Sequence, residues 1–401
     1  MKIIAEIGTS HAGSLEKAFA LIDAAKDAGA DFIKFQWVYA DEILHPDTGF
    51  VKLPGGSVRL YDRFKALEVD KSFFEKCIDY THKKGLLFAC SPFGLKSFRE
   101  LVSCPVDAIK IASPEVNHFE LLKEVSKYYS KIPIILSSGV SKLSDIEKAI
   151  EIIKSTYQKE KGLDEAPSIN GIAPLTLLHC ITSYPAPENE YNVRAVKTLS
   201  DIFGLPCGIS DHSLDPILIP VLADMMGGQM VEKHITLSKK TDGLDDPVAL
   251  EADEFALMSH CIHQSDALLE RWHKEKVAVK NDDNNFLEND FFLNQAQNQI
   301  VKQLLENYSL EKILAVLGTG KKSLAKSESL NYGRTNRSLH YMSSFLKGHK
   351  IQKDDIKILR TEKVLSPGIS PEYLNLLEGA TLVRNVENGQ GVQFEDFIQK
   401  D

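Results

Sequence analysis

The sequence lacks several features that mark other classes of protein. None of its apolar runs approaches the ~18 residues of a membrane span, and Glu6 interrupts the first run, where a secretion signal needs an apolar core. We therefore expect a cytoplasmic protein. Positive charge is also not in excess, because 47 Lys and Arg stand against 56 Asp and Glu. A net charge of -9 argues against nucleic acid or an anionic membrane as the main partner.

Cysteine is sparse, and its spacing excludes two further classes. The 401 residues contain six cysteines and no Cys-x-x-Cys pair, so neither a zinc ribbon nor a compact disulfide scaffold is indicated. The composition, 43% hydrophobic and 26% charged, is that of a globular protein with a sizeable core. We expect reduced thiols at all six positions, which are Cys77, Cys90, Cys104, Cys180, Cys207 and Cys261.

Short apolar runs alternate with segments of helical period over the first 235 residues. This rhythm predicts repeated strand–helix units, and eight of them favour a (β/α)8 TIM barrel. A Rossmann fold is disfavoured because no G-x-G-x-x-G follows the first run. Ser14 is the expected N-cap of the first helix. The predicted strands are 2–7, 31–36, 86–91, 107–112, 133–137, 175–180, 207–210 and 229–235, with helices over 15–28, 71–84, 117–129, 143–154 and 193–203.

The rhythm breaks after about residue 270, which predicts three parts. Residues 1–270 form the barrel, 271–320 an insertion or linker with a helix over 295–317, and 321–401 a small terminal domain. The linker contains the polar, acidic stretch 281–290. Residues 321–363 carry 11 Lys and Arg against 4 Asp and Glu, so the small domain begins with a basic region.

Charged residues recur on one face of the predicted strands. Alternate strand residues point to the same side, and Lys and Glu are rarely buried unless paired. In a TIM barrel the active site lies at the carboxyl ends of the strands, where these charges fall. The recurrence predicts a site built from five strands, with faces Ile4-Glu6-Gly8, Phe32-Lys34-Gln36, Ala108-Lys110-Ala112, Gly208-Ser210-His212 and Glu232-His234.

Two lysines and three serine turns on these strands suit a phosphate group. The ammonium groups of Lys34 and Lys110 would neutralise it, while hydroxyls and turn N–H groups donate to its oxygens. Serine before Pro or Gly is more often a simple turn former. Three such turns at successive strand ends, at Ser91, Ser113 and Ser137, nevertheless favour a binding role.

His212 and His234 end neighbouring strands. Two neutral imidazoles can hold a divalent metal while leaving positions open for oxygen ligands, which favours Mn²⁺ or Mg²⁺ over a closed zinc site. The alternative for either histidine alone is a hydrogen-bonded structural role. Together they predict a metal site.

The chain resembles the N-acetylneuraminate (sialic acid) synthases and their legionaminate and pseudaminate relatives. The motifs occur in family order over about the first 250 residues, and NRSL (336–339) and PGISP (367–371) resemble the family's small antifreeze-like (SAF) domain less closely. The barrel motifs are AEIGTSHAGS (5–14), IKFQ (33–36), CSPF (90–93), IKIASPE (109–115), ILSSGV (135–140), LLHCITSYPAP (177–187), GISDHSLD (208–215) and EKHIT (232–236).

This resemblance implies a TIM barrel with a SAF cap that condenses phosphoenolpyruvate with an N-acetylated aminosugar, giving a nine-carbon 2-keto acid and phosphate. It implies that His212 and His234 hold the metal. Glu6 would move a proton or activate water, and Tyr184, Asp245 and Gln36 would position the sugar, with Glu6, Tyr184 and Asp245 as the catalytic group. The implied substrate-binding residues are Lys34, Gln36, Ser91, Lys110, Ser113, Glu115, Ser137, Thr182 and Ser210.

Two departures from the family put the identity of the sugar in question. Members often carry an arginine before the PGISP run of the cap, where this chain has Val364. If the cap still contacts the sugar, Arg337 or Arg360 must take over. Some members have Asn where this chain has Thr182. The resemblance also implies a homodimer in which each C-terminal domain caps the partner's barrel.

Three alternatives remain open at the level of the sequence. The first is another phosphoenolpyruvate-dependent synthase that makes an eight- or seven-carbon acid. The second is an aldolase that uses a lysine covalently, and the third is a catalytically silent sugar-binding protein of a polysaccharide pathway. The histidine pair and the cap favour the sialate-type synthase over the first. The presence of Glu6, Lys34, Lys110, His212 and His234 argues against the third.

Overall fold

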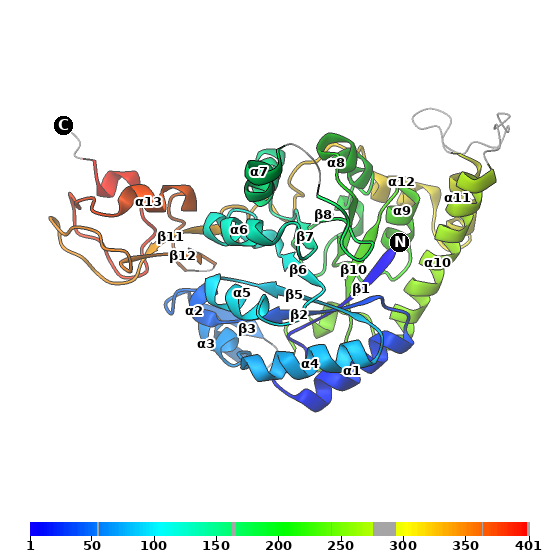
Figure 1. The fold of residues 1–401 in the computed structure, drawn as a ribbon, viewed down its shortest axis with the longest axis horizontal. Helices are drawn as coiled ribbons and strands as arrows, with labels where there is room; N and C mark the ends of the chain where they lie inside the picture. Colours follow the sequence, from blue (N-terminus) through cyan, green and yellow to red (C-terminus); the bar gives the residue numbers. More distant parts are fainter. Residues whose placement is uncertain (54–55, 163–165, 242, 276–293, 363, 399–401) are drawn as a thin grey trace.

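Eight parallel strands close into a barrel in the computed structural model, which describes residues 1–53, 56–162, 166–241, 243–275, 294–362 and 364–398 (Figure 1). Their order is β1-β10-β9-β8-β7-β6-β5-β2, with β2 closing on β1. The predicted TIM barrel is confirmed. The strands are β1 (Lys2–Gly8), β2 (Phe32–Trp37), β5 (Leu87–Pro92), β6 (Ala108–Ile111), β7 (Ile134–Ser137), β8 (Leu175–Cys180), β9 (Cys207–Asp211) and β10 (Met230–His234).

Helices surround the barrel, and their starts follow local capping. The side chain of Ser14 accepts a hydrogen bond from the Lys17 N–H at the start of α1, as predicted, and Asp70 caps α4 in the same way. A hairpin, β3 (Phe50–Leu53) and β4 (Gly56–Arg59), extends the loop after β2. The helices are α1 (Leu15–Asp27), α2 (Ala40–Ile43), α3 (Leu60–Lys65), α4 (Lys71–Lys83), α5 (Leu95–Leu101), α6 (Phe119–Val125), α7 (Leu143–Lys161), α8 (Ala195–Phe203), α9 (Leu218–Met225) and α10 (Ala252–Glu275).

The inside of the barrel has an apolar layer and a polar layer. In the register, Glu6 pairs with Lys34 on one side and His234 on the other, so these residues lie at one level. The inward-facing residues two positions earlier form the apolar layer. The polar layer therefore lies toward the carboxyl ends of the strands, as the alternation predicted. The apolar layer contains Ile4, Phe32, Ala89, Ala108, Ile135, Leu178 and Met230.

Two helices follow the barrel where the sequence suggested one. These are α11 (Gln295–Leu304), which packs on α9 and α10, and α12 (Leu310–Leu317), which packs on α9 and on the turn Glu188–Glu190. Asn294 and Ser309 each accept a hydrogen bond from the third residue of the helix that follows, so each segment has its own N-cap. The predicted acidic stretch 281–290 lies outside the described residues.

The C-terminal domain has a core of its own beside the barrel (Figure 1). It is built on an antiparallel pair, β11 (Arg337–Tyr341) and β12 (Ile356–Arg360), with the short helix α13 (Leu374–Leu377). The pair contacts α2, so the small domain is joined to the mouth of its own barrel. Its core residues are Leu339, Tyr341, Ile351, Ile356, Ile358, Leu377, Leu382, Val386 and Val392.

Two further expectations concern thiols and the membrane. All six cysteines are free, and five of them are buried, which confirms the expected absence of disulfides. Among the described helices, none combines the length and the apolar character that crossing a membrane requires.

Asp224 on α9 gives a prediction about stability. The residue is 2% exposed, one of its carboxylate oxygens has no hydrogen-bond partner, and burial raises its pKa to about 7. Between the ordinary pKa of 3.8 and this value, the folded chain binds a proton that the unfolded chain does not. Stability therefore falls as pH rises through this window. We expect Asp224→Asn to raise the Tm by about 2–5 °C at pH 8 and by less at pH 5.

Thermal unfolding at the two pH values checks this expectation. Asp201→Asn is the matched control, because that carboxylate is exposed and paired only with Lys197 on the surface. An equal gain at both pH values, or a loss of stability at pH 8, would contradict the role assigned to Asp224.

Candidate active site

A cavity of about 220 Å³ opens at the carboxyl ends of the barrel strands. It collects side chains from all eight barrel strands and from the loops that follow them. Thirteen of the fourteen site residues predicted from the sequence line this cavity. They are Glu6, Lys34, Gln36, Ser91, Lys110, Ser113, Ser137, Thr182, Tyr184, Ser210, His212, His234 and Asp245.

Buried charges alternate along one side of the cavity. Lys34 Nζ lies 2.6 Å from Glu6 Oε2 and 3.6 Å from Glu232 Oε2. Lys110 Nζ lies 2.9 Å from each oxygen of Glu232. The hydroxyl of Ser210 donates to Glu232 at 2.9 Å. Two ammonium groups thus face two carboxylates, which is how charged groups become tolerable in a barrel interior.

The two lysines differ in how firmly they hold their protons. Burial alone would lower the pKa of Lys34, but the carboxylates of Glu232 and Glu6 outweigh it and raise that pKa. The pKa of Lys110 is lowered by burial and by the charge of Lys34, despite its bond to Glu232. Burial opposes ionisation of Glu232, yet Lys110 and Lys34 hold its pKa well below the usual range. The four groups therefore act as one balanced cluster.

Three hydroxyls of the cavity have no hydrogen-bond partner among the described residues. The Oγ atoms of Ser91 and Ser137 and the Oγ1 atom of Thr182 are buried and unpaired. They come from the ends of β5 and β7 and from the loop after β8. Buried polar atoms are normally paired. Unpaired donors beside two lysines form a surface that suits an oxyanion such as phosphate.

Gly8 allows the side chains at the end of β1 to meet. Its φ of +57° is in the left-handed region, and a Cβ there would lie 3.3 Å from both Gln36 Nε2 and Glu6 Oε1. The Gln36 amide donates to Glu6 Oε1 at 2.8 Å. Asp245 reaches the same place from the loop after β10, with Oδ2 at 3.7 Å from that Cβ position. Glycine is therefore required where three polar residues converge.

The two imidazoles lie side by side, with ring centroids 5.6 Å apart. His212 Nδ1 bonds to the Ile181 carbonyl at 2.8 Å, so Nδ1 is the donor and Nε2 remains available. His234 Nδ1 is buried, has no hydrogen-bond partner in the part of the chain that the structure describes, and lies 3.9 Å from Asp245 Oδ2. The Tyr184 ring packs on His212 at 4.2 Å.

These residues fit a divalent metal with an open coordination shell. The donors are two imidazole nitrogens, and no group of three or more His, Cys, Asp or Glu side chains is placed to hold a metal in the part of the chain that the structure describes. Cys180 Sγ, 3.8 Å from His212 Nδ1, helps to raise the pKa of His212 to about 9 despite burial. Protons therefore compete with a metal at this histidine.

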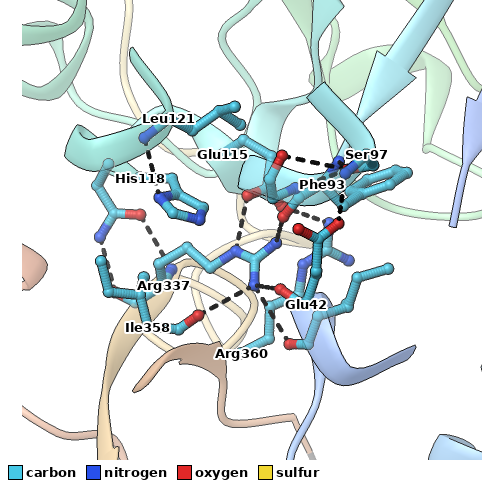
Figure 2. A network of polar contacts seen from close by, with 12 residues as sticks. Glu42, Phe93, Ser97, Glu115, His118, Leu121, Arg337, Ile358 and Arg360 are labelled. Atoms are coloured by element: carbon cyan, nitrogen blue, oxygen red, sulfur yellow. Dashed lines mark hydrogen bonds and ion pairs between the residues drawn. The ribbon is translucent and has the colours of Figure 1, made fainter. Parts of the chain in front are cut away.

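Glu115 is the predicted site residue that does not line the cavity. Its oxygens accept from Arg337 Nε at 2.7 Å and from Arg360 Nη2 at 2.8 Å, and the carboxylate is fully buried (Figure 2). Burial opposes ionisation, but the two guanidinium groups lower the pKa of Glu115. The structure thus places Glu115 outside the cavity lining, where it joins the C-terminal domain to the barrel, and its expected substrate contact stays a prediction.

Of the two arginines that the sequence offered as sugar contacts, Arg360 lines the cavity and Arg337 does not. Arg337 instead donates to the backbone oxygens of Glu42 and Phe93, at 2.5 and 2.6 Å (Figure 2). Val364 lies in the C-terminal domain with 66% exposure. Because the chain's own barrel supplies these contacts, Arg360 reaches the cavity of its own chain, and the homodimer stays a prediction.

Sequence reasoning missed several residues of the cavity. Cys180 could have been found, because it shares a strand face with the inward-pointing Leu178. Phe64 and Leu67 come from the loop that carries the extra hairpin, where no strand alternation exists to assign a direction. A second cavity of about 370 Å³ lies outside the barrel mouth between Pro185, Leu214 and α12.

The chain is similar to known proteins over its whole length. Residues 21–274 match the NeuB family and residues 347–398 match the SAF domain. Spore coat polysaccharide biosynthesis protein SpsE of Bacillus subtilis is 29% identical over 402 residues, covering 100% of this chain and 94% of that protein. Its crystal structure has a TM-score of 0.74 and covers 100% of this chain and 96% of the other.

Two further relatives have names that refer to sugar acids. N,N'-diacetyllegionaminic acid synthase of Legionella pneumophila is 28% identical over 399 residues, covering 98% of this chain and 93% of that protein. The crystal structure of N-acetylneuraminic acid (sialic acid) synthetase from Leptospira borgpetersenii, in complex with citrate, is 29% identical with a TM-score of 0.56. That match covers 77% of this chain and 92% of the other.

The ion triad at Glu115 gives a prediction about stability. Glu115→Ala leaves two guanidinium groups buried without their carboxylate, and we expect a loss of about 3–5 kcal/mol in unfolding free energy. Glu372→Gln is the control, because Glu372 pairs with Lys148 on the exposed side of the same domain junction. This variant should cost less than about 1 kcal/mol. Denaturant unfolding compares the two, and equal losses would contradict the assignment.

Proposed function

Because the chain belongs to the NeuB family and carries a SAF domain, we propose that it condenses phosphoenolpyruvate with an N-acetylated aminosugar. The products would be a nine-carbon 2-keto sugar acid and phosphate. The acceptor class follows the names of the relatives, so N-acetylmannosamine or a related diacetamido sugar is the proposed substrate. The enzyme would thus be a sialic-acid-type synthase.

One observation carries the proposal. Lys34, Lys110 and the unpaired hydroxyls of Ser91, Ser137 and Thr182 line the same small cavity as the two imidazoles. Phosphoenolpyruvate brings a phosphate and a carboxylate, which need cations and hydroxyl donors. Its partner is an aldehyde that must be activated beside it. A cavity with both kinds of group side by side supports this pair of reactants.

The reaction forms one carbon–carbon bond and one carbon–oxygen bond, and it breaks one carbon–oxygen bond. The C3 atom of phosphoenolpyruvate attacks the aldehyde carbon, whose oxygen becomes a hydroxyl after taking up a proton. Water then adds to the C2 atom and loses a proton. The tetrahedral carbon finally releases phosphate and leaves a ketone at C2. Atoms and electrons balance without any oxidant or reductant.

The side chains of this site fit those steps. We assign to Glu6 the role of accepting a proton from the attacking water. Lys34 and Gln36 fix its carboxylate in place. Tyr184 and Asp245 line the mouth of the cavity, and we assign them to the sugar. The apolar side chains of Phe64 and Leu67, which also line the cavity, suit the methyl group of an acetamido substituent.

His212 and His234 would hold a divalent metal, Mn²⁺ or Mg²⁺. When bound, such an ion acts as a Lewis acid toward a carbonyl group. The chain's contribution is to keep the imidazoles in place. The bond from His212 Nδ1 to the Ile181 carbonyl and the packing of the Tyr184 ring do this.

Phosphate release from phosphoenolpyruvate in the presence of Mn²⁺ tests the proposal across a panel of acceptors. N-acetylmannosamine and a diacetamido trideoxyhexose should support release, whereas four- and five-carbon sugar phosphates should not. Preference for those sugar phosphates would indicate a synthase of seven- or eight-carbon acids. Acceptor binding without turnover would indicate a catalytically silent sugar-binding protein.

The metal gives a prediction with a pH dependence. Because the pKa of His212 is about 9, a proton occupies this imidazole at lower pH. The affinity for Mn²⁺ should therefore rise as pH increases from 6 to 9. His234→Ala should bind Mn²⁺ at least about tenfold more weakly, since one of two imidazole donors is lost. Calorimetric titration with Mn²⁺ measures both. His82→Ala is the control, because His82 pairs with Asp107 away from the cavity. Equal Mn²⁺ affinity in both variants would contradict the site.

Lys110 gives a prediction that separates binding from covalent catalysis. Lys110→Met should raise the KM for phosphoenolpyruvate roughly ten- to a hundredfold, because a charge-assisted contact is lost. Lys197→Met on the surface of α8 is the control. Borohydride should trap no pyruvate on the wild-type chain. A trapped adduct would instead identify an aldolase, for which the lowered pKa of Lys110 would be suitable.

A further inference from the structure

Residues 318–336 join the barrel helices to the C-terminal domain, and we name this segment the connector. It contacts the loops that line the cavity. Three of its polar side chains are almost completely buried: Lys322 is 7% exposed, Glu328 1% and Asn336 6%. Each of them bonds to backbone atoms of the turn that follows β7 or of the loop that follows β8. A linker that only joined two domains would not need these contacts.

Glu328 ties two strand ends together. A single oxygen, Oε1, accepts hydrogen bonds from the Val140 N–H and from the Thr182 N–H, both at 2.7 Å. The other oxygen, Oε2, accepts from Ala325 N–H within the connector at 3.2 Å. A buried carboxylate that accepts three backbone N–H groups is fixed in place and fixes its partners.

The turn after β7 depends on outside support. Val140 is a β-branched residue with a φ of +41°, in the left-handed region that such residues avoid. Its N–H donates to Glu328, and its carbonyl accepts from Asn336 Nδ2 at 3.1 Å. Lys322 Nζ donates to the Ser138 carbonyl at 2.9 Å. The connector therefore holds the strained turn on both sides of Gly139.

The same turn brings the cavity hydroxyls together. A Cβ on Gly139 would lie 2.2 Å from Thr182 Oγ1 and 2.9 Å from Ser113 Oγ, so only glycine fits there. The Gly139 N–H donates to Ser113 Oγ at 2.9 Å. Ser137, with its unpaired Oγ, is the last residue of β7, two residues before Gly139. Any shift of this turn moves the hydroxyls relative to one another.

We propose that Glu328 is a positioning residue that sets the spacing of the hydroxyls contributed by Ser137 and Thr182, and thereby the affinity for the phosphate of phosphoenolpyruvate. Glu328 does not line the cavity, so it acts through the backbone that it holds. The inference rests on the proposed function, because it names the substrate group that the hydroxyls receive. It gives the connector, which lies outside the barrel strands, a role in positioning the active site.

Three variants test the proposal by their separate effects on KM and kcat. Glu328→Ala removes the shared acceptor and should raise the KM for phosphoenolpyruvate about tenfold or more, with the KM for N-acetylmannosamine changed less than about threefold. Glu328→Gln keeps a carbonyl oxygen that can accept both N–H groups, and it should restore the KM to within about threefold of wild type. Glu328→Asp shortens the side chain by one methylene, which moves the acceptor oxygen away from both N–H groups. This variant replaces Glu328→Ala in the test if Glu328→Ala does not fold.

Glu190→Ala is the matched control. Glu190 Oε2 accepts from the Ser327 N–H at 2.9 Å, so this variant loosens the same connector without removing a hydrogen bond to Val140 or Thr182. It should leave both KM values unchanged. Equal KM changes for the two substrates, or a control that matches Glu328→Ala, would overturn the proposal in favour of a general loss of structure.

Calorimetric binding of phosphoenolpyruvate separates this inference from the proposed function. Wild-type protein that binds no phosphoenolpyruvate would overturn both. Wild-type protein that binds it, together with a folded Glu328→Ala or Glu328→Asp chain of equal affinity, would overturn only the role of Glu328. Weaker binding in these variants, with rescue by Glu328→Gln, is the expected result.

Discussion

The carboxylate of Glu232 is the constraint on which the polar half of the barrel depends. It receives Lys110 and Ser210 directly and lies within reach of Lys34, so one side chain compensates both buried ammonium groups. Unpaired charges at this depth would be strongly destabilising. The barrel carries two buried lysines because β1 supplies Glu6 beside Lys34 and β10 supplies Glu232, at the same level as the hydroxyl that β9 supplies. An anionic substrate entering here meets cations that are already desolvated and held in place.

Strand alternation explains why the sequence predicted most of this arrangement. Inward-facing residues at the ends of barrel strands have only one direction to point, so Glu6, Lys34 and Lys110 could be placed together from parity alone. Glu115 differs because it follows β6 on the short turn Ser113–Glu115, where parity no longer applies. Its partner Arg337 is 222 residues away, and no local pattern reveals a pairing over that distance. The IKIASPE motif singled out Glu115 in the sequence, but the contacts of this residue depend on the C-terminal domain.

Buried polar groups join the two domains. Glu115 takes both arginines of the β11–β12 pair, and Asn117 exchanges hydrogen bonds with the backbone of Arg337 in both directions. Such contacts are direction-specific, because each lost partner would leave a buried charge or amide unpaired. They fix the orientation of the small domain on the barrel. Glu328 of the connector accepts hydrogen bonds from the backbone of the cavity loops. The segment that leads to the small domain therefore also contacts these loops.

This junction also explains how an arginine reaches the cavity although the position at which the family often has one is Val364 in this chain. Val364 follows β12 by several residues and is exposed, whereas Arg360 is the last residue of that strand. A strand end that is hydrogen-bonded to β11 and bridged to Leu44 has a fixed place and direction. The guanidinium group is then held between Glu115 and the ring of Phe93, whose centroid lies 5.2 Å away. Position 364 lies in the loop beyond, where the Val364 N–H donates to the Thr48 carbonyl at 3.2 Å, so the strand end rather than this loop supplies the cation that lines the cavity.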